Sequence, residues 1–564
     1  MPSRTPRLVV AGLAATSLLA PATAAVAQGP ADRPGPPEQS TLDLQLLSFN
    51  DFHGHLQPSD GLGGAAALAG TIDELRAEHG TKTSLVVSTG DIIGGSTFLS
   101  GMFQDEPAVE VVEAMDLAVS AVGNHEFDEG VDELLRMQEG GCHPDLRCFG
   151  DEPYDGADYP YLAANVVDRE TGEPVLAPYH VEKVRGVKIG FIGAVTTDTA
   201  IMVSPSGIAD VEFLDEAETI NRYAAELQQQ GVETIIALVH EGGSQDSEAG
   251  INDCVDLTGP ITDLNASTTA EVDAIITGHT HDGYVCSLPD PAGDPRLVTQ
   301  AANYGEVLSE LVLPIDRATK DVLRERVTAT NHAVTTEGPI DAEVAAIVDY
   351  WDQASEPIAA RVVGTVEEDI TGDASGDRGI ETPMADLVAD SILWGTSGDN
   401  GGAEIALMNV GGVRASLLVD DITNNEQPGE VTYAEAYEVA PFGNQLVTMD
   451  LTGAQLEQVL EQQYLPGRSR EMLALGVSEG FSYTWDADAN EVVDGSMTLN
   501  GDPVLPGETY RVATLNFLAD GGDGFTVFTE GTNVTGGPED LANLVAFLQA
   551  HPGLTAPEDR VTGL

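Results

Sequence analysis

Lysine is almost missing from this 564-residue chain, in which only Lys82, Lys183, Lys188 and Lys320 occur. Arginine does not make up for it, because lysine and arginine together number 24 against 93 aspartates and glutamates, a formal net charge of −69. A surface this negative repels polyanions, so nucleic-acid polymers and anionic membranes are not expected partners. A small anionic substrate would need positive charge supplied locally, by metal ions and arginines.

Long apolar runs are also missing beyond the N-terminal end of the chain. Residues 1–27 combine two arginines with an apolar stretch and a small-residue Ala-Val-Ala sequence. This pattern is typical of a signal peptide cleaved near Ala27, and the apolar stretch is too short to serve well as a membrane anchor. Residues 28–40, rich in proline and glycine, predict a flexible leader. We therefore expect a secreted or periplasmic protein with no membrane span.

Cysteine is scarce, and its four positions are Cys142, Cys148, Cys254 and Cys286. An even number in an exported chain favours two disulfides, for which four cysteines allow three pairings. The most local pairing joins Cys142 to Cys148 and Cys254 to Cys286. The alternative is a zinc site that uses His143, but the chain lacks the paired short-spaced cysteines typical of such sites.

The length of the chain favours two domains. Residues 41–338 alternate strand and helix patterns, such as a short apolar strand at 84–89 and a helix at 65–78, which is typical of an α/β domain. Residues 339–360 predict one linking helix, and residues 361–555 predict a second, mixed α/β domain. In α/β sheets the loops at the carboxyl ends of the strands build the active site.

Five segments that follow predicted strands in the first domain carry oxygen and imidazole donors. They are Asn50-Asp51-Phe52-His53-Gly54, Gly90-Asp91, Gly123-Asn124-His125-Glu126-Phe127-Asp128, Val239-His240 and Gly278-His279-Thr280-His281. Each alone is more typical of a turn, a loop or a buried core histidine. Together they hold five of the 11 histidines of the chain. Aspartate, asparagine and histidine without thiolate suit a hard or borderline divalent ion such as Zn²⁺, Mn²⁺ or Co²⁺.

The order of these motifs resembles that of the calcineurin-like metallophosphoesterases, and the longer segments at 50–54 and 123–128 narrow the resemblance to the 5'-nucleotidase branch. The resemblance implies a four-layer α/β/β/α sandwich with two divalent metal ions. By position, it implies that one ion is held by Asp51, His53 and His281, that the second is held by Asn124, His240 and His279, and that Asp91 bridges the two. Position 281 varies in this family, and some relatives have glutamine there.

The resemblance also implies a catalytic pair next to the metal ligands. His125 directly follows Asn124, and Asp128 lies three residues further on. In the family the aspartate orients the histidine, which stabilises the phosphoryl charge in the transition state. A positioned, charge-assisted donor of this kind contributes a few kcal/mol.

The second domain contains polar and aromatic residues near glycines. Arg378 and Arg414 each follow a glycine turn, where a planar guanidinium suits phosphate because it donates two parallel hydrogen bonds. Phe442 and Phe517 lie in loops near glycine, where a ligand could stack on an exposed ring. Asp523 could accept hydrogen bonds from a ribose. Taken alone, Phe517 could be a core residue, and the glycine-rich segment around Asp523 could form a tight turn or a calcium loop.

These second-domain segments resemble, in order, the substrate-specificity domain of the same family. The resemblance implies that Arg378 and Arg414 bind phosphate with Asn409 beside them. It also implies that Phe442 and Phe517 sandwich the base and that Asp523 binds ribose. Val410 departs from the Asn-Gly-Gly-Gly run of many relatives.

The sequence therefore predicts a secreted dinuclear-metal phosphohydrolase that converts nucleoside 5'-monophosphates to nucleoside and phosphate. Its substrate would be a small nucleotide, and the protein would be a monomer or homodimer. The same metal centre would serve hydrolysis of UDP-sugar or dinucleotide pyrophosphates, or of 2',3'-cyclic nucleotides. A non-catalytic secreted binding protein is the alternative from another class, but it would not need His125 and Asp128.

Overall fold

The computed structural model describes residues 40–59, 61–144, 148–149, 153–203, 207–246, 249–372, 377–398, 401–466, 468 and 470–564. The predicted signal peptide and the predicted leader up to residue 39 lie outside the described residues. Among the helices that are described, none has both the length and the apolar character needed to cross a bilayer.

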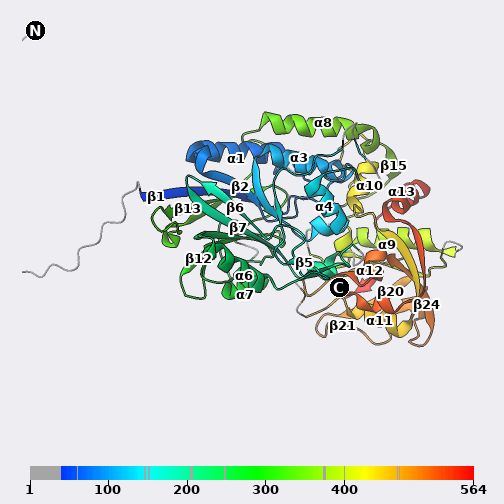
Figure 1. The fold of residues 1–564 in the computed structure, drawn as a ribbon. Helices are drawn as coiled ribbons and strands as arrows, with labels where there is room; N and C mark the ends of the chain where they lie inside the picture. The colour runs from blue at the N-terminus through cyan, green and yellow to red at the C-terminus, as the bar shows by residue number, and fades with distance from the viewer. Residues whose placement is uncertain are drawn as a thin grey trace, which may run out of the picture.

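Two six-stranded sheets form the first part of the chain (Figure 1). The first has the order β14-β13-β1-β2-β3-β4, with bounds Thr328–Ala333, Val307–Asp316, Thr41–Phe49, Ser84–Ser88, Leu117–Ala121 and Tyr161–Leu162. The second has the order β11-β12-β10-β9-β7-β6, with bounds Gly283–Pro289, Pro295–Ala301, Ala274–Thr277, Thr234–His240, Val187–Val195 and Tyr179–Val184. Strands β1 to β4 are mutually parallel, and so are β7, β9, β10 and β12, so within each set the carboxyl ends lie at one edge.

The two sheets pack face to face through a shared apolar core. Leu44 of β1 and Val87 of β2 contribute from the first sheet, and Phe191 of β7 and Leu238 of β9 from the second, all fully buried. Such continuous apolar strands suit a sheet that is covered on both faces.

Helices cover the outer faces of the two sheets. Those against the first sheet are α1 (Ala65–His79) and α3 (Glu106–Ala114), on which α8 (Ala342–Ala359) packs, and those against the second are α6 (Glu216–Gln229) and α7 (Pro260–Ser267). The remaining elements of this part are α2 (Phe98–Gly101), α4 (Val131–Glu139), α5 (Thr199–Met202), β5 (Val166–Asp168), β8 (Val211–Phe213), η2 (Thr81–Thr83), η3 (His125–Phe127) and η4 (Arg324–Arg326). The predicted α/β/β/α sandwich is confirmed.

Helix α8 corresponds to the predicted linking helix. The Asp341 side chain caps its first turn by accepting the N–H groups of Glu343 and Val344, which leaves fewer unpaired amides at the helix start. The helix packs on α1 and α3, and Figure 1 shows it running across the first part toward the second. The domain boundaries given above stay sequence predictions.

The second part is built on three small sheets. A five-stranded sheet has the order β19-β16-β24-β18-β25, with bounds Leu475–Val477, Ile405–Asn409, Thr509–Leu515, Gln445–Thr452 and Thr532–Glu539. A second sheet contains β21 (Glu491–Val492), β20 (Phe481–Asp486), β22 (Thr498–Leu499), β23 (Asp502–Pro503) and β26 (Val561–Thr562). Strands β15 (Val362–Thr365) and β17 (Glu430–Thr432) pair with each other.

Local capping signals begin several helices of the second part. Thr432 and Glu435 form a capping box at α10 (Tyr433–Val439), and Thr452 and Gln455 form another at α11 (Gly453–Glu461). The other helical elements are α9 (Pro383–Thr396), α12 (Asn516–Ala519), α13 (Asp540–Ala550), η6 (Val410–Gly412), η7 (Gly522–Gly524) and η8 (Thr526–Glu530).

The two parts touch through a small aromatic cluster. Phe98 of α2 lies edge-on to Tyr433 and Tyr437 of α10, with ring centroids 6.2 and 5.5 Å apart. Helix α5 also contacts η7, which contains Asp523. These contacts bring loops of the second part close to the strand ends of the first.

Candidate active site

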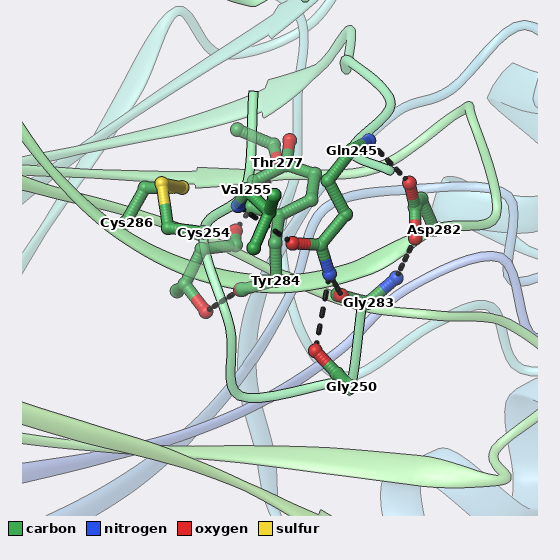
Figure 2. The surroundings of a disulfide bond; sticks show 10 residues. Gln245, Gly250, Cys254, Val255, Thr277, Asp282, Gly283, Tyr284 and Cys286 are labelled. Carbon is green, nitrogen blue, oxygen red and sulfur yellow. Dashed lines mark hydrogen bonds between the residues drawn. A yellow bond between two sulfur atoms is a disulfide. The ribbon is translucent and has the colours of Figure 1, made fainter. Parts of the chain in front are cut away.

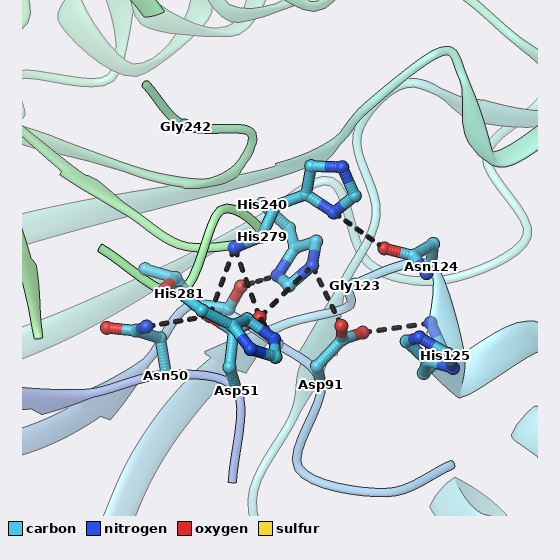
Figure 3. A network of polar contacts seen from close by, with 12 residues as sticks. Asn50, Asp51, Asp91, Gly123, Asn124, His125, His240, Gly242, His279 and His281 are labelled. Atoms are coloured by element: carbon cyan, nitrogen blue, oxygen red, sulfur yellow. Dashed lines mark hydrogen bonds and ion pairs between the residues drawn. The ribbon is translucent and has the colours of Figure 1, made fainter. Parts of the chain in front are cut away.

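All five predicted donor segments meet at the carboxyl ends of parallel strands. Asp51, Asp91 and Asn124 follow β1, β2 and β3 of the first sheet, whereas His240 ends β9 and His279 follows β10 of the second (Figure 3). The site therefore lies at the junction of the two sheets, as the strand-loop pattern predicted.

The backbone at several of these residues is left-handed. The φ angles are 49° at Asp51, 51° at Asp91 and 74° at His279. Two further donors, His53 and His281, also have positive φ, at 47° and 60°. Side chains rarely adopt this conformation unless the surrounding structure imposes it, and such residues cluster at functional sites.

The donor atoms form overlapping groups. The Nε2 atom of His281 lies 3.3 Å from Oδ1 of Asp51, and Nε2 of His240 lies 3.0 Å from Oδ2 of Asp91. Donor atoms lie within 4.8 Å of one another in three groups: Asp51, His53 and His281; Asp51, Asp91 and His240; and His53, Asp91 and His125. Because Asp51 and Asp91 each belong to two groups, the arrangement suits two neighbouring ions rather than one.

Two buried histidines have a ring nitrogen suited to a metal ion. Nδ1 of His53 lies 2.7 Å from the carbonyl oxygen of Gly94, and Nδ1 of His240 lies 2.8 Å from that of Thr89. A carbonyl can only accept, so in each ring Nδ1 carries a proton and Nε2 is the nitrogen that could bind a metal ion. Both Nε2 atoms are buried and have no hydrogen-bond partner within the described part of the chain. These residues fit a metal centre.

The electrostatics of the cluster also favour a cation. Burial is the main cause that lowers the pKa of His53, His279 and His281, so these imidazoles are neutral. Burial also lowers the pKa of His240, but Asp91 and Asp51 outweigh it and raise that pKa to about 10. The two carboxylates thus create a negative potential that a bound cation would balance.

The remaining predicted ligand, Asn124, lies beside His279. Its Oδ1 atom is 2.9 Å from Nδ1 of the His279 ring. The structure therefore brings together all seven residues that the sequence proposed as ligands.

His125 and Asp128 are paired beside this cluster. Burial lowers the pKa of His125, but Asp128 and Asp91 outweigh it and raise the pKa above its ordinary value. The backbone N–H of His125 donates to Oδ1 of Asp91 at 2.8 Å, which ties the pair to the metal loops. The raised pKa favours the imidazolium form of His125 beside the cluster.

One pocket is lined by both parts of the chain. The first part contributes Asp91, Asn124, His125, Asp128, His279 and His281, and the second contributes all six predicted substrate residues, Arg378, Asn409, Arg414, Phe442, Phe517 and Asp523. Residues up to about four hundred positions apart in sequence thus face the same space, as expected for a site between two domains.

Phe442 and Phe517 differ in their surroundings. The Phe442 ring stacks on His125, with centroids 6.1 Å apart and an 18° interplanar angle, and Arg414 lies 5.8 Å from its centroid. Phe517 is partly buried against both apolar cores of the second part and lies against Gly522, where any side chain would collide with the ring. Phe517 is thus both a core residue and a pocket residue.

Asn409, which lines the pocket, is hydrogen-bonded to Asp523. Its Nδ2 atom donates to Oδ2 of Asp523 at 2.9 Å, whereas its buried Oδ1 atom has no partner within the described residues. Arg378 also approaches, because its Nη1 atom and the Asn409 amide both lie close to Gly411. The three side chains form one polar surface.

Residues 44–283 match the family described as calcineurin-like phosphoesterase, and residues 362–530 match the family described as 5'-nucleotidase, C-terminal domain. The chain is 31% identical over 574 residues to the cell wall protein Lmo0130 of Listeria monocytogenes, covering 96% of this chain and 70% of that protein. A solved 5'-nucleotidase precursor from Thermus thermophilus has a TM-score of 0.75 at 27% identity, covering 92% of this chain and 99% of that one. The chain belongs to the 5'-nucleotidase family.

A third relative widens the range of chemistry to consider. The chain is 34% identical over 526 residues to a Bacillus subtilis protein named endonuclease YhcR, covering 91% of this chain. It spans 40% of the length of YhcR. This chain is therefore a metallophosphoesterase of the 5'-nucleotidase family, and its buried histidines and aspartates suit a dinuclear metal site.

Glu126 is a residue to which the sequence assigned no role. It is 3% exposed, and its carboxylate accepts the N–H groups of Asp91 and Ile92, both at 2.8 Å, and that of Gly123. Burial and the nearby Asp91 raise the pKa of Glu126 to about 7. Glu126 therefore joins two metal-binding loops. Its place within the 123–128 segment was the only signal.

Asn50 and Tyr304 also support the ligand Asp51. Asn50 donates from Nδ2 to Oδ2 of Asp51 at 2.6 Å, and the Tyr304 N–H donates to the Asp51 carbonyl at 2.7 Å. The Tyr304 ring stacks on His55 with centroids 3.8 Å apart. No local pattern could have identified Tyr304, which is more than 250 positions from Asp51.

The disulfides join Cys142 to Cys148 and Cys254 to Cys286, the most local pairing, so these thiols are not free for a zinc site. Figure 2 shows the second bond with Gln245, Asp282 and Gly283 in its surroundings. Gln245 donates from its backbone to Oδ2 of Asp282, the residue after His281, at 2.8 Å. Its side chain also donates to the Gly283 carbonyl at 2.7 Å. Gln245 also accepts the N–H of Val255, next to Cys254, at 3.2 Å, so it links the disulfide to the loop that carries His281.

Proposed function

We propose that this protein hydrolyses nucleoside 5'-monophosphates to nucleoside and phosphate. The observation that carries the proposal is the shared pocket, in which the metal cluster and His125 face Arg414 and Phe442. A metal cluster alone would serve any phosphoester. An arginine and an aromatic ring next to it favour a substrate with both a phosphate and a base.

The residues have separate roles in the proposed reaction. Two divalent ions, Zn²⁺, Mn²⁺ or Co²⁺, held by the seven predicted ligands would supply Lewis acidity toward the phosphoryl oxygens. His125, kept protonated by Asp128, would donate a hydrogen bond to a phosphoryl oxygen as its charge grows.

The second part would hold the rest of the nucleotide. Arg378 and Arg414 would bind phosphoryl oxygens, Phe442 and Phe517 would contact the base, and Asp523 would accept hydrogen bonds from ribose hydroxyls. Asn409 fits this scheme, because its unpaired Oδ1 could accept a further hydrogen bond from the ligand.

Phosphodiester cleavage is the second candidate function. It is favoured by the name of the relative YhcR, an endonuclease, and it would use the same metal cluster. The net charge of −69 opposes binding of a long polyanion. Pyrophosphate hydrolysis of UDP-sugars and opening of 2',3'-cyclic nucleotides remain alternatives within the same chemistry.

The deciding experiment compares these substrates on one preparation. Phosphate release is measured from AMP, UDP-glucose and 2',3'-cyclic AMP, and strand cleavage is measured on single-stranded and duplex DNA. Each assay is repeated after chelation and after metal is restored, with His125→Ala as the inactive control. AMP turnover that is lost on chelation and restored by metal supports the proposal. Efficient cleavage of DNA or UDP-glucose without AMP turnover would refute it.

We also propose that the protein acts outside the cytoplasm. The two disulfides and the cell-wall protein among its relatives support this location. Expression of the full chain in a bacterial host, followed by N-terminal sequencing of exported protein, tests it. A mature chain that starts near Gln28 is expected, and retention of the intact N-terminus in the cytoplasm would contradict the proposal.

A further inference from the structure

Arg470 lines the candidate pocket, although no sequence motif singles it out. It lies between α11 and β19, close to Arg378 and Arg414 of the same pocket. Within the described part of the chain its guanidinium forms no hydrogen bond or ion pair. A partly buried guanidinium has five N–H donors, so this one is left with donors to satisfy.

Arg468, two residues earlier, differs from Arg470 because its guanidinium is hydrogen-bonded to the protein backbone. It is 8% exposed, and its guanidinium donates to the backbone carbonyls of Arg470 at 2.8 Å and Asp523 at 2.6 Å. It also donates to the carbonyl of Gln463 at 2.6 Å. Arg468 therefore fixes the segment that carries Arg470 to the turn that carries Asp523, and it presents Arg470 to the pocket.

Arg470 belongs to a group of guanidiniums that line one pocket with Arg378 and Arg414. Burial is the main cause that lowers the pKa of Arg470, and Arg414 lowers it further. Asp523 is the sole acid that the second part contributes to the lining described. Guanidinium groups gathered around one pocket favour the binding of an anion there.

Arg470 and Arg414 line the same pocket as His125, His279 and His281. An anion bound at the cluster would therefore lie in a space that both guanidinium groups line.

We propose that Arg470 is a further substrate-contacting residue, which binds the phosphoryl group of the substrate together with Arg414 in the pocket that both residues line. The proposal deepens the function given above and rests on the substrate being a phosphate ester. It does not depend on the nucleoside part. Arg468 is then a positioning residue for this contact.

Binding of inorganic phosphate to the full, metal-loaded chain tests the proposal directly. Isothermal titration calorimetry is carried out on wild type, Arg470→Met, Arg470→Lys and the control Arg326→Met, an exposed arginine in η4. A charge-assisted contact predicts a dissociation constant roughly ten- to a hundredfold higher in Arg470→Met, a smaller increase in Arg470→Lys, and no change in the control. Metal content is measured in each sample and should not change.

Adenosine binding, measured in the same way, separates a phosphate contact from general distortion of the pocket. The proposal predicts that Arg470→Met binds adenosine as wild type does. Equal phosphate affinity in wild type and Arg470→Met would overturn it, and so would a parallel loss of phosphate and adenosine binding. If wild type binds phosphate but not adenosine, the nucleotidase proposal fails while the role of Arg470 is still decided by the phosphate titration.

Discussion

The Nδ1 atom of His125 lies 2.8 Å from Oδ2 of Asp128, and the same oxygen accepts the N–H of Gly95 at 3.0 Å. The imidazole is thus fixed by a carboxylate that is itself fixed by the backbone. With Nδ1 committed to Asp128, Nε2 is the nitrogen left to donate to a substrate. The pairing suits the proposed role of His125, which is to contact substrate beside the predicted ligand Asn124 without binding metal itself.

His125→Ala is expected to lower turnover by a factor of roughly 10² or more, because a positioned donor to developing charge is lost. The metals should stay bound, since the proposed ligand set is untouched. Turnover and metal content are measured together, and His180→Ala, which removes a histidine paired with Glu182 on the distant strand β6, is the control. Wild-type turnover in His125→Ala would show that the proposed mechanism is wrong.

Glu126→Gln is expected to weaken metal binding by roughly ten- to a hundredfold, as loss of a supporting hydrogen bond to a metal loop commonly does. The amide replaces one acceptor oxygen with a donor, which would face the N–H groups of Asp91, Ile92 or Gly123. Metal affinity is measured by titrating Mn²⁺ into metal-free protein. The control is Glu139→Gln, at the end of α4 and exposed. Equal affinities in both variants would mean that Glu126 does not hold the loops in place.

Much of the first part could be predicted because its signals are local. The helix expected at residues 65–78 is α1, Ala65–His79, which is bounded by Gly64 and Gly80. The donor segments could be grouped because each follows a strand, and parallel strands end at one edge of a sheet. Which of their residues bind metal was predicted from the family resemblance and not from this pattern.

The features of the site that the sequence did not predict depend on contacts between segments that are distant in the chain. Nothing near Arg470 in sequence indicates that it faces the metal loops, because its position is set by Arg468 and the turn at Asp523. Phe517 was open to interpretation as core or as ligand contact, and the structure gives it both surroundings. Three disulfide pairings were equally allowed by cysteine count alone.

Removal of the long-range disulfide is expected to destabilise the protein more than removal of the short one. Cys254 and Cys286 are 32 residues apart and Cys142 and Cys148 are 6 apart. Loop-closure entropy predicts a loss of roughly 3–4 kcal/mol in unfolding free energy for Cys254→Ser/Cys286→Ser and roughly 2 kcal/mol for Cys142→Ser/Cys148→Ser. Urea unfolding measures both. Thiol labelling of the unfolded, unreduced wild type should find no free cysteine, and one labelled thiol would contradict the pairing.

Asp386 is expected to make stability depend on pH. It is 1% exposed on α9, and burial, with Glu381 as the next cause, raises its pKa to about 8. The pKa of an unfolded aspartate is about 3.9, so folding favours the protonated form, and its contribution to stability is lost as pH rises from about 4 through about 8. Asp386→Asn is neutral throughout and should remove this part of the pH dependence.

Urea unfolding at about pH 5 and about pH 9 measures the Asp386 effect, since these values lie on either side of the raised pKa. The difference in unfolding free energy between the two conditions should be smaller in Asp386→Asn than in wild type. Asp488→Asn, an exposed aspartate in the β20–β21 turn, should leave the difference unchanged. A difference in Asp386→Asn equal to that of wild type would show that Asp386 is not the group responsible.

Phe442 and Phe517 should matter for a substrate with a base and not for one without. Stacking of one base on an aromatic ring contributes about 1–3 kcal/mol, so Phe442→Ala/Phe517→Ala should raise KM for AMP by roughly ten- to a hundredfold. The KM for p-nitrophenyl phosphate should change little, because its small leaving group does not need the clamp. The predicted ligands and the Asp128 contact that fixes His125 are kept in these variants, so kcat for p-nitrophenyl phosphate should also persist.

The single variants separate stacking from packing. Phe442 contacts His125 and Arg414 at the pocket, whereas Phe517 also packs against two cores, so Phe517→Ala should lower the melting temperature more than Phe442→Ala. Phe149→Ala, a phenylalanine 39% exposed and packed on Phe103, is the control. The decisive variant is therefore Phe442→Ala, in which KM for AMP should rise while stability stays near wild type. Equal losses on AMP and p-nitrophenyl phosphate in that variant would mean that Phe442 supports His125 rather than a base, and the nucleotide proposal would lose its main physical support.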